Sequence, residues 1–330
     1  MFPGKKMYFC LLVLAFITVT WFVLLGYRMD HYVLIQKVAV LGLFFSVAKF
    51  LSYALLQKNG DEFVQRFPFA DNKRKAIVVL IEGFFFIYFS WLVLRVFNHL
   101  TMTVPIPYAD EKLIQLDQLI GLNWQEYFKF VAQSPLLVLI FDKAYTGLSN
   151  LSLIAFVGLV LTNRLKQAKF FVVAFSITAI VCTLIGMFFP AKAAVDQLLT
   201  EPQLLNNFPY SPGTYSVEII ERLRSSKSQF FDLDNLPGLT TFPSFHTAAG
   251  IVLVYSYRGS FLVIPVLIYT VIMIASTPVF GGHYFVDIIA GTVVALVICR
   301  LVERTSEFGG VFQKSYSNKH VSSWNDARVN

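Results

Sequence analysis

The chain has 330 residues, of which 56% are hydrophobic and only 14% charged, with a formal net charge of +7. Soluble domains contain about 25% charged residues, so this composition excludes an ordinary soluble protein and favours an all-α integral membrane protein. The three cysteines all lie inside apolar stretches, which argues against a disulfide framework or a zinc site.

Apolar stretches of spanning length recur along the chain. Since a spanning helix needs about 20 mostly apolar residues, we predict a bundle of about eight transmembrane helices. The first stretch lacks a cleavage site and is interpreted as an anchor, not a signal peptide. The second and sixth are the weakest. The stretches are 7–27, 32–56, 76–97, 136–161, 169–189, 242–257, 260–280 and 283–302.

The distribution of Lys and Arg predicts the orientation. An even number of spans places both termini on one side, and the loops on that side contain more Lys and Arg. The positive-inside rule therefore places both termini in the cytoplasm, and we expect a plasma (inner) membrane protein. Basic loops that face anionic lipid account for the net charge without a nucleic-acid partner.

Two segments differ from the spans. Residues 105–134 mix acids with Leu and Ile at helical spacing, which predicts an interfacial amphipathic helix. Residues 190–241 are polar and rich in proline, with a short helix expected near 216–228, and a connection of this length is often functional. We divide the chain into three N-terminal spans (1–104), a catalytic core (105–304) that contains the outer loop 190–241, and a flexible cytoplasmic tail (305–330).

Two histidines are predicted at the same membrane face. His246 lies in TTFPSFHTAAG (240–250) and His283 in STPVFGGHYFVDIIAG (276–291). The chain crosses the membrane twice between the two histidines and so returns to the outer side. The span that carries each histidine begins on that side. We expect Thr240 or Thr241 to cap the earlier helix, with Pro243 in its first turn. Helix N-termini attract anions, so both ends together predict a phosphate site.

Asp287 completes the predicted site. On a helix it lies one turn from His283 and can accept a hydrogen bond from one ring nitrogen, leaving the other nitrogen as a nucleophile. His246 is then the general acid and base, and the intermediate is a phosphohistidine. Gly281 and Gly282 allow the backbone to approach a ligand. This chemistry requires no metal and no cofactor.

These motifs resemble the type 2 phosphatidic acid phosphatase superfamily. FPSFHTA is similar to its P-S-x-H element and GGHYFVD to its G-x-H-x-x-x-D element. The motif residues are most similar to those of the branch that contains fungal inositol phosphorylceramide synthase, and the resemblance covers roughly residues 105–302. The resemblance implies a six-helix phosphatase-like core, a phospholipid or lipid-phosphate substrate, and a lipid or polyol hydroxyl as a possible acceptor.

The chain departs from the superfamily at its cationic positions. It has no Arg-Pro dipeptide, and Thr277 occupies the position of the usual arginine before the second histidine. Phosphate oxygens therefore need other ligands. Tyr145 is assigned to the aromatic belt of the membrane interface. The substrate-binding candidates are Ser244, Phe245, Gly281, Gly282, Arg224, Lys143 and Arg95, with Lys192 as a further possible cation.

Several functions remain open at this point. Transfer of a phosphorylated headgroup, such as inositol phosphate, to a lipid hydroxyl would make the protein a phosphotransferase, and water as acceptor would make it a lipid phosphatase. A lipid transporter without chemistry is the alternative from another class, because Arg95, Lys49 and Glu82 lie within or beside predicted spans.

Overall fold

Helices are the main secondary structure in the part of the chain described by the computed structural model, which comprises residues 2–57, 68–225, 230–234 and 236–309. No strand occurs within these ranges apart from an isolated bridge between Arg28 and Phe230. The tail expected at 305–330 lies outside the described residues from 310 onward. The helices are α1 (Lys5–Leu24), α2 (His31–Gln57), α4 (Pro68–Thr101), α5 (Asp110–Leu119), α6 (Trp124–Ala132), α7 (Pro135–Thr146), α8 (Leu148–Leu161), α9 (Leu165–Phe188), α10 (Ala194–Leu198), η1 (Pro202–Asn207), α11 (Val217–Arg224), α12 (Phe245–Ser256), α13 (Val263–Phe280) and α14 (Phe285–Glu303).

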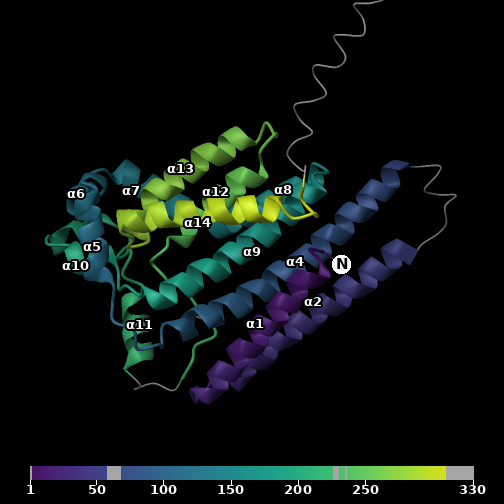
Figure 1. Ribbon diagram of the computed structural model, residues 1–330, viewed down its shortest axis with the longest axis horizontal. Coiled ribbons are helices and arrows are strands. Elements are labelled where there is room, and N and C mark those ends of the chain that lie inside the picture. The colour runs from purple at the N-terminus through teal and green to yellow at the C-terminus, as the bar shows by residue number, and fades with distance from the viewer. Residues whose placement is uncertain (1, 58–67, 226–229, 235, 310–330) are drawn as a thin grey trace, which may run out of the picture.

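The long helices form a bundle whose short helices gather at one end (Figure 1). Helices α1 and α2 pack on α4, and α4 packs on α9, so the first three helices form a layer against the remainder. The short helices α5, α6, α10 and α11 lie where α4 and α9 end and α14 begins. This end contains both histidines.

The prediction of an all-α membrane protein is confirmed, whereas the number of spans is not fixed. Six helices in the described ranges are long and apolar enough to cross a bilayer, or seven if α7 and α8, bent by 56°, form one span. The sixth predicted span is only the 12-residue helix α12. At 1.5 Å per residue it extends about 18 Å, well short of a hydrocarbon layer of about 30 Å.

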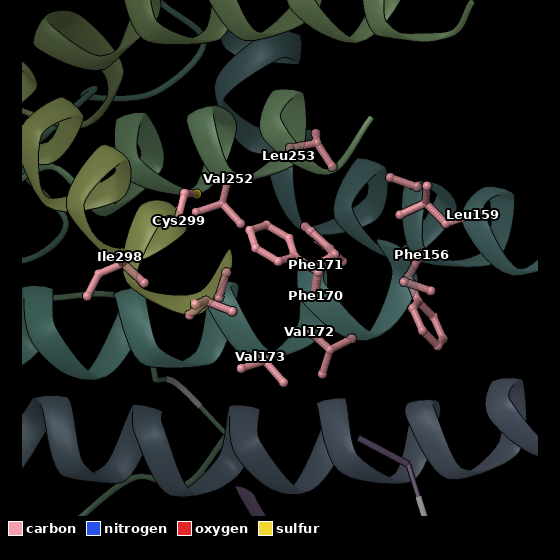
Figure 2. Close-up of a cluster of buried hydrophobic side chains, with 14 of the residues drawn as sticks. Phe156, Leu159, Phe170, Phe171, Val172, Val173, Val252, Leu253, Ile298 and Cys299 are labelled. Atoms are coloured by element: carbon pink, nitrogen blue, oxygen red, sulfur yellow. The ribbon is translucent and has the colours of Figure 1, made fainter. Parts of the chain in front are cut away.

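Helix α12 lies inside the bundle, which explains how so short a helix is accommodated. It packs against α14, α13 and α9, and most of its residues are buried. Val252 and Leu253 of α12 meet Phe170 and Phe171 of α9 and Cys299 of α14 in the main core (Figure 2). A helix enclosed by protein need not match the bilayer thickness. Its first residues are therefore held at a depth set by its neighbours.

The segment 105–134 forms two helices, α5 and α6, where we expected one. The chain turns between them at Gly121, whose φ of +73° is unfavourable for other residues. In α5, Leu116 and Leu119 are exposed, while Asp110 and Asp117 are buried against the protein. The amphipathic character was predicted correctly, and the acidic face is the one that contacts the bundle.

Candidate active site

A hydrogen-bonded series of three side chains lies at the short-helix end of the bundle. Nδ1 of His283 is 3.2 Å from Oδ2 of Asp287, and Nε2 of the same ring is 3.3 Å from Oγ of Ser244. All three side chains are almost inaccessible, with exposed fractions of 3% for His283 and 0% for Asp287 and Ser244. The contact between His283 and Asp287 that the sequence predicts is therefore present.

The local structure that makes this contact differs from the expected helical turn. His283 precedes α14, which begins at Phe285. Asp287 lies in the first turn, and its Oδ2 also accepts a hydrogen bond of 3.0 Å from the Tyr284 N–H. Asp287 thus caps its own helix and binds the imidazole with the same oxygen. Because two donors share that oxygen, the ring orientation of His283 depends on the start of α14.

The hydrogen bonds around Ser244 assign the tautomer of His283. Oγ of Ser244 accepts hydrogen bonds from the N–H and the hydroxyl of Thr247, at 3.4 and 3.2 Å. Its single hydrogen is then left for Nε2 of His283, which must accept it. Nδ1 consequently carries the ring proton and donates to Asp287. The Nε2 lone pair is the one available for nucleophilic attack.

Helix α12 begins at least three residues after the expected position, so Pro243 precedes the helix. Ser244 is its N-cap and Phe245 its first residue, so neither Thr240 nor Thr241 caps it. The N–H of Ser244 donates to the Asp287 carbonyl oxygen at 3.0 Å. The N–H groups of Phe245 and His246 have no protein acceptor within the described ranges, as expected for a first helical turn. The phenyl ring of Phe245 packs on Phe175, so Phe245 presents its backbone to the site.

Gly291 permits the close approach of α12 to α14. A Cβ atom at this position would lie 2.4 Å from the carbonyl oxygen of Ser244. That oxygen is a backbone atom and cannot rotate away, so a side chain here would separate the two helices.

We therefore expect Gly291→Ala to displace Ser244 from His283. The substitution should destabilise the fold by about 1–3 kcal/mol, as overpacking does. Any activity of the site should fall with it. Gly42→Ala in α2, where nothing lies within 4 Å of the added carbon, is the matched control. Thermal unfolding in detergent measures both, and equal stability of the two variants would contradict the close approach.

The N-terminus of α14 is occupied by a carboxylate, contrary to its expected role as an anion site. Asp117 of α5 accepts hydrogen bonds from the N–H groups of Phe285 and Val286, at 2.9 and 2.8 Å. Burial raises the pKa of Asp117, and the two N–H donors oppose that rise. These N–H groups are therefore unavailable to phosphate, and of these two helix starts it is that of α12 which retains N–H groups without an acceptor among the described residues.

A second aspartate of α5 supports the same helix start. Oδ1 of Asp110 accepts a hydrogen bond of 2.8 Å from the Tyr284 hydroxyl, and both carboxylate oxygens lie 3.1 Å from the Lys192 N–H. Burial raises the pKa of Tyr284, so its hydroxyl remains a donor. Helix α5 thereby joins the loop before α14 to the segment 190–241 at Lys192.

Tyr145 belongs to the site and not to an interfacial belt. Its ring stacks on the imidazole of His246, with centroids 4.1 Å apart and an interplanar angle of 13°. It is 7% exposed. Its hydroxyl oxygen lies 2.9 Å from that of Tyr215 in the segment 190–241. His246 in turn interacts electrostatically with His283, so the structure brings both histidines into one site.

The two glycines of the second motif have different surroundings. A Cβ atom on Gly281 would lie 2.5 Å from Cδ2 of His283 and 2.9 Å from the hydroxyl oxygen of Tyr145, so Gly281 lines the site. Gly282, with φ of +65°, instead packs against Gly213 and Ala193. Its carbonyl oxygen accepts a hydrogen bond of 2.8 Å from the Ala194 N–H. Gly282 therefore fastens the segment 190–241 to the site at Ala193, Ala194 and Gly213.

Of the four candidate cations, Arg95 is the one that interacts electrostatically with His246 and has no partner of its own among the described residues. Its guanidinium makes no hydrogen bond or ion pair with the described residues, and it interacts electrostatically with Tyr145, Tyr215 and His246. It also lies beside Gly238, where a Cβ atom would be 3.4 Å from Nη1.

The other three cations are engaged elsewhere. Lys143 is largely exposed and pairs with Asp142 at 3.0 Å. Lys192 pairs with Glu221 at 2.6 Å. Arg224 donates to the carbonyl oxygens of Met102 and Ile106, at 3.1 and 3.0 Å. The structure thus does not bring Lys143 or Arg224 to the histidines.

Five contributors to the site were not proposed from the sequence. For two of them a signal exists, because Asp110 and Asp117 share one face of a helix whose other face is apolar. The other three are aromatic residues in a chain rich in aromatic residues, and their spacing does not distinguish them. The five are Asp110, Asp117, Tyr145, Tyr215 and Tyr284.

No group of three potential metal ligands occurs within the described part of the chain.

Comparison with known proteins gives the family. The profile of the PAP2 superfamily matches residues 111–301, more than half of the chain, and this range includes both histidines and Asp287. No curated protein and no solved structure matches the chain significantly. Helices α1, α2 and α4 precede the matched range. The chain belongs to the PAP2 superfamily, as a membrane protein built around that family's helical domain.

Proposed function

We propose that this protein is a lipid phosphotransferase that passes a phosphorylated headgroup from a phospholipid to a hydroxyl acceptor through a phosphohistidine on His283. The observation that supports this most is the arrangement Asp287–His283–Ser244, in which the only hydrogen of Ser244 is directed to Nε2. Membership of a superfamily of phosphatases and phosphotransferases is consistent with it.

The reaction follows from the assigned tautomer. The Nε2 lone pair of His283 attacks phosphorus, and the bond from phosphorus to the lipid oxygen breaks. His246, when protonated, transfers its proton to that oxygen as it leaves. Asp287 stabilises the positive charge that develops on the substituted ring. The acceptor hydroxyl then gives its proton to His246, its oxygen attacks phosphorus, and the P–N bond breaks to restore the Nε2 lone pair.

Arg95 and the start of α12 are the ligands that we assign to the phosphate oxygens. The guanidinium of Arg95 has no partner among the described residues, and the N–H groups of Phe245 and His246 are also free. An arginine fork suits phosphate because it donates two parallel hydrogen bonds. Because α4 precedes the range matched by the family, the N-terminal helices supply a part of the site that the family domain lacks here.

The charge of this site favours transfer over hydrolysis of a phosphomonoester. A phosphomonoester carries a charge of about −1.5 to −2 at pH 7, whereas a phosphodiester carries about −1. The other candidate cations, Lys143, Lys192 and Arg224, already have partners. One guanidinium matches a singly charged diester, as in a phospholipid with a polyol headgroup of the inositol type. Transfer from such a diester is the reaction proposed for the branch that the motifs resemble.

Of the three polar residues that suggested a transporter, Arg95 is one that we assign to the candidate active site. Arg95 interacts electrostatically with His246. Glu82 accepts a 2.6 Å hydrogen bond from the Phe2 N–H and, with Lys49, lines a separate small cavity beside Tyr8. These positions do not favour a polar path.

The orientation of the protein is part of the proposal. The basic loops support cytoplasmic termini, which places the histidines at the outer face of the membrane. An external substrate would then reach the site without crossing the bilayer.

The proposal is tested by incubating purified protein, in sealed vesicles of known orientation, with phospholipids of different headgroups, with and without a ceramide or diacylglycerol acceptor. We expect a new phospholipid that requires the acceptor, formed from water-soluble short-chain substrates only when the predicted outer face is exposed. Release of inorganic phosphate from phosphatidic acid, independent of an acceptor, would replace transfer by hydrolysis. Inertness toward every lipid would overturn the enzymatic proposal.

Replacing Arg95 tests the phosphate ligand. We expect Arg95→Gln to lower kcat/KM by about 10²-fold, because a charged hydrogen-bond donor to the transition state is lost. Lys129→Gln is the control, since Lys129 at the same end of the molecule forms an exposed ion pair with Glu201. An unchanged rate for Arg95→Gln would remove Arg95 from the site.

A further inference from the structure

Two tyrosine hydroxyls meet at the site and have no role in the reaction described above. The hydroxyl oxygens of Tyr145 and Tyr215 lie 2.9 Å apart. Neither hydroxyl forms another hydrogen bond with the described residues. Between them they carry two hydrogens, and their mutual hydrogen bond uses one. The second hydrogen is therefore available to a ligand.

The free hydroxyl lies beside the reactive edge of His283. A single methyl group on Gly281 would contact both Cδ2 of His283, at 2.5 Å, and the hydroxyl oxygen of Tyr145, at 2.9 Å. In an imidazole ring Cδ2 is bonded directly to Nε2, the nitrogen that attacks phosphorus. A phosphoryl group on Nε2 would thus come next to Tyr145. The absence of a side chain at Gly281 keeps the space between them open.

The stack on His246 holds the Tyr145 ring in this position. The two rings are nearly parallel, so the hydroxyl of Tyr145 extends past the imidazole toward His283. Arg95 interacts electrostatically with both tyrosine oxygens. The Tyr145 hydroxyl therefore lies beside the edge of His283 where the oxygens of a phosphoryl group would be, and the Tyr215 hydroxyl oxygen is 2.9 Å from it.

The outer segment fixes the second tyrosine. Tyr210 donates a 2.6 Å hydrogen bond to Asp142 of α7, and Gly213 packs against Gly282. The first contact holds the segment that carries Tyr215 against α7, the helix that carries Tyr145, and the second holds it against the loop before α14. Burial also raises the pKa of Tyr215, which keeps its hydroxyl protonated at neutral pH.

We propose that Tyr145 is a further catalytic residue, whose hydroxyl donates a hydrogen bond to a nonbridging oxygen of the phosphoryl group at His283, and that Tyr215 positions this hydroxyl. The inference rests on the proposed phosphohistidine chemistry. In the transition state the nonbridging oxygens share the negative charge, and fixed donors around them lower the barrier. Neutral hydroxyls provide such donors without the additional cations that the superfamily usually places here.

The test removes each hydroxyl and keeps its ring. Tyr145→Phe should retain the stack on His246 and lower kcat by about 10²-fold, as loss of one transition-state donor does. Tyr215→Phe should lower kcat by about 10-fold. The double variant should be no slower than Tyr145→Phe, because groups that act as one unit are not additive. Tyr127→Phe is the matched control, since its partly buried hydroxyl donates to the Ala275 carbonyl oxygen.

A second readout separates catalysis from structural support. Vanadate imitates the phosphoryl group in its transition state, and such analogues bind in proportion to transition-state stabilisation. Its inhibition constant should rise by about 10²-fold in Tyr145→Phe, while KM changes by less than about 3-fold. A change in KM or thermal stability alone, with vanadate inhibition retained, would overturn the catalytic role.

The outcomes distinguish this inference from the proposed function. If the wild type turns over, His283→Ala does not, and Tyr145→Phe matches the wild type, then the role of Tyr145 is wrong and the phosphohistidine proposal stands. If the wild type is inert and insensitive to vanadate, both are overturned.

Discussion

His283→Ala should lower kcat by about 10⁴–10⁶-fold, the loss seen when a catalytic nucleophile is removed. The imidazole supplies the only nitrogen in the Asp287–His283–Ser244 series, and Ser244 has no general base within this series once the ring is gone. The measurement is transfer of a labelled headgroup by purified protein in lipid vesicles.

The variant should remain folded in the membrane. Asp287 retains the Tyr284 N–H as a donor, so the cap of α14 persists without the imidazole. His31→Ala, at the exposed first residue of α2, controls for loss of a histidine as such. Lipid transfer that continues at more than a tenth of the wild-type rate would contradict the nucleophile, and flux of unmodified lipid in the variant would favour transport.

Asp287→Asn should lower kcat by about 10³-fold with little change in KM, because Asp287 is fully buried and acts through His283. An asparagine can place its carbonyl oxygen where Oδ2 lies and so accept from both Tyr284 and His283. The tautomer is then preserved, and the loss reports the missing negative charge opposite the imidazolium. Asp287→Ala removes the acceptor as well and should cost about 10⁴-fold.

The comparison of the two variants tests the orienting role. Oδ1 of Asp287 is buried without a hydrogen-bond partner in the described part of the chain, so the amide nitrogen of Asn would be placed there without an acceptor. A modest loss of stability should therefore accompany Asp287→Asn. Equal activity of Asp287→Asn and the wild type, or a loss confined to KM, would contradict an electrostatic role for the carboxylate.

The structural features that the sequence predicts correctly are those whose contacts are local or repeat along a helix. His283 and Asp287 were paired from their spacing, and that pairing occurs even though His283 precedes the helix. The apolar stretches located the long helices because backbone groups in a bilayer must be paired within a helix. The position of Ser244 before α12 follows from the same kind of local signal, although the cap was assigned to a neighbouring threonine.

The remaining parts of the site depend on contacts between distant segments. Asp117 occupies the end of α14, and Tyr145 stacks on His246, through packing that no local pattern encodes. An aromatic residue near the end of a span is common at membrane interfaces, so the belt was the natural interpretation for Tyr145. In the structure α7 instead packs on α13, and the Tyr145 ring lies against His246 at the start of α12.

Arg95 was predicted as a candidate ligand from the sequence, but only the structure separates it from the other candidate cations. Its position near the predicted outer end of the third span made it a candidate. From the sequence alone, Lys143 and Arg224 were equally good candidates for a phosphate ligand. Only the contacts of Asp142 with Lys143, and of two backbone carbonyls with Arg224, distinguish them from Arg95.

The most direct measurement is to trap the covalent intermediate. Purified protein is mixed with a phospholipid that carries a labelled phosphodiester headgroup, in the absence of acceptor, and is denatured in alkali to preserve a phosphoramidate. Digestion and mass spectrometry should locate the phosphorylated headgroup on Nε2 of His283, and an added acceptor should discharge it. Label on Ser244, or turnover with no label on His283 at any time, would contradict the phosphohistidine on which the account depends.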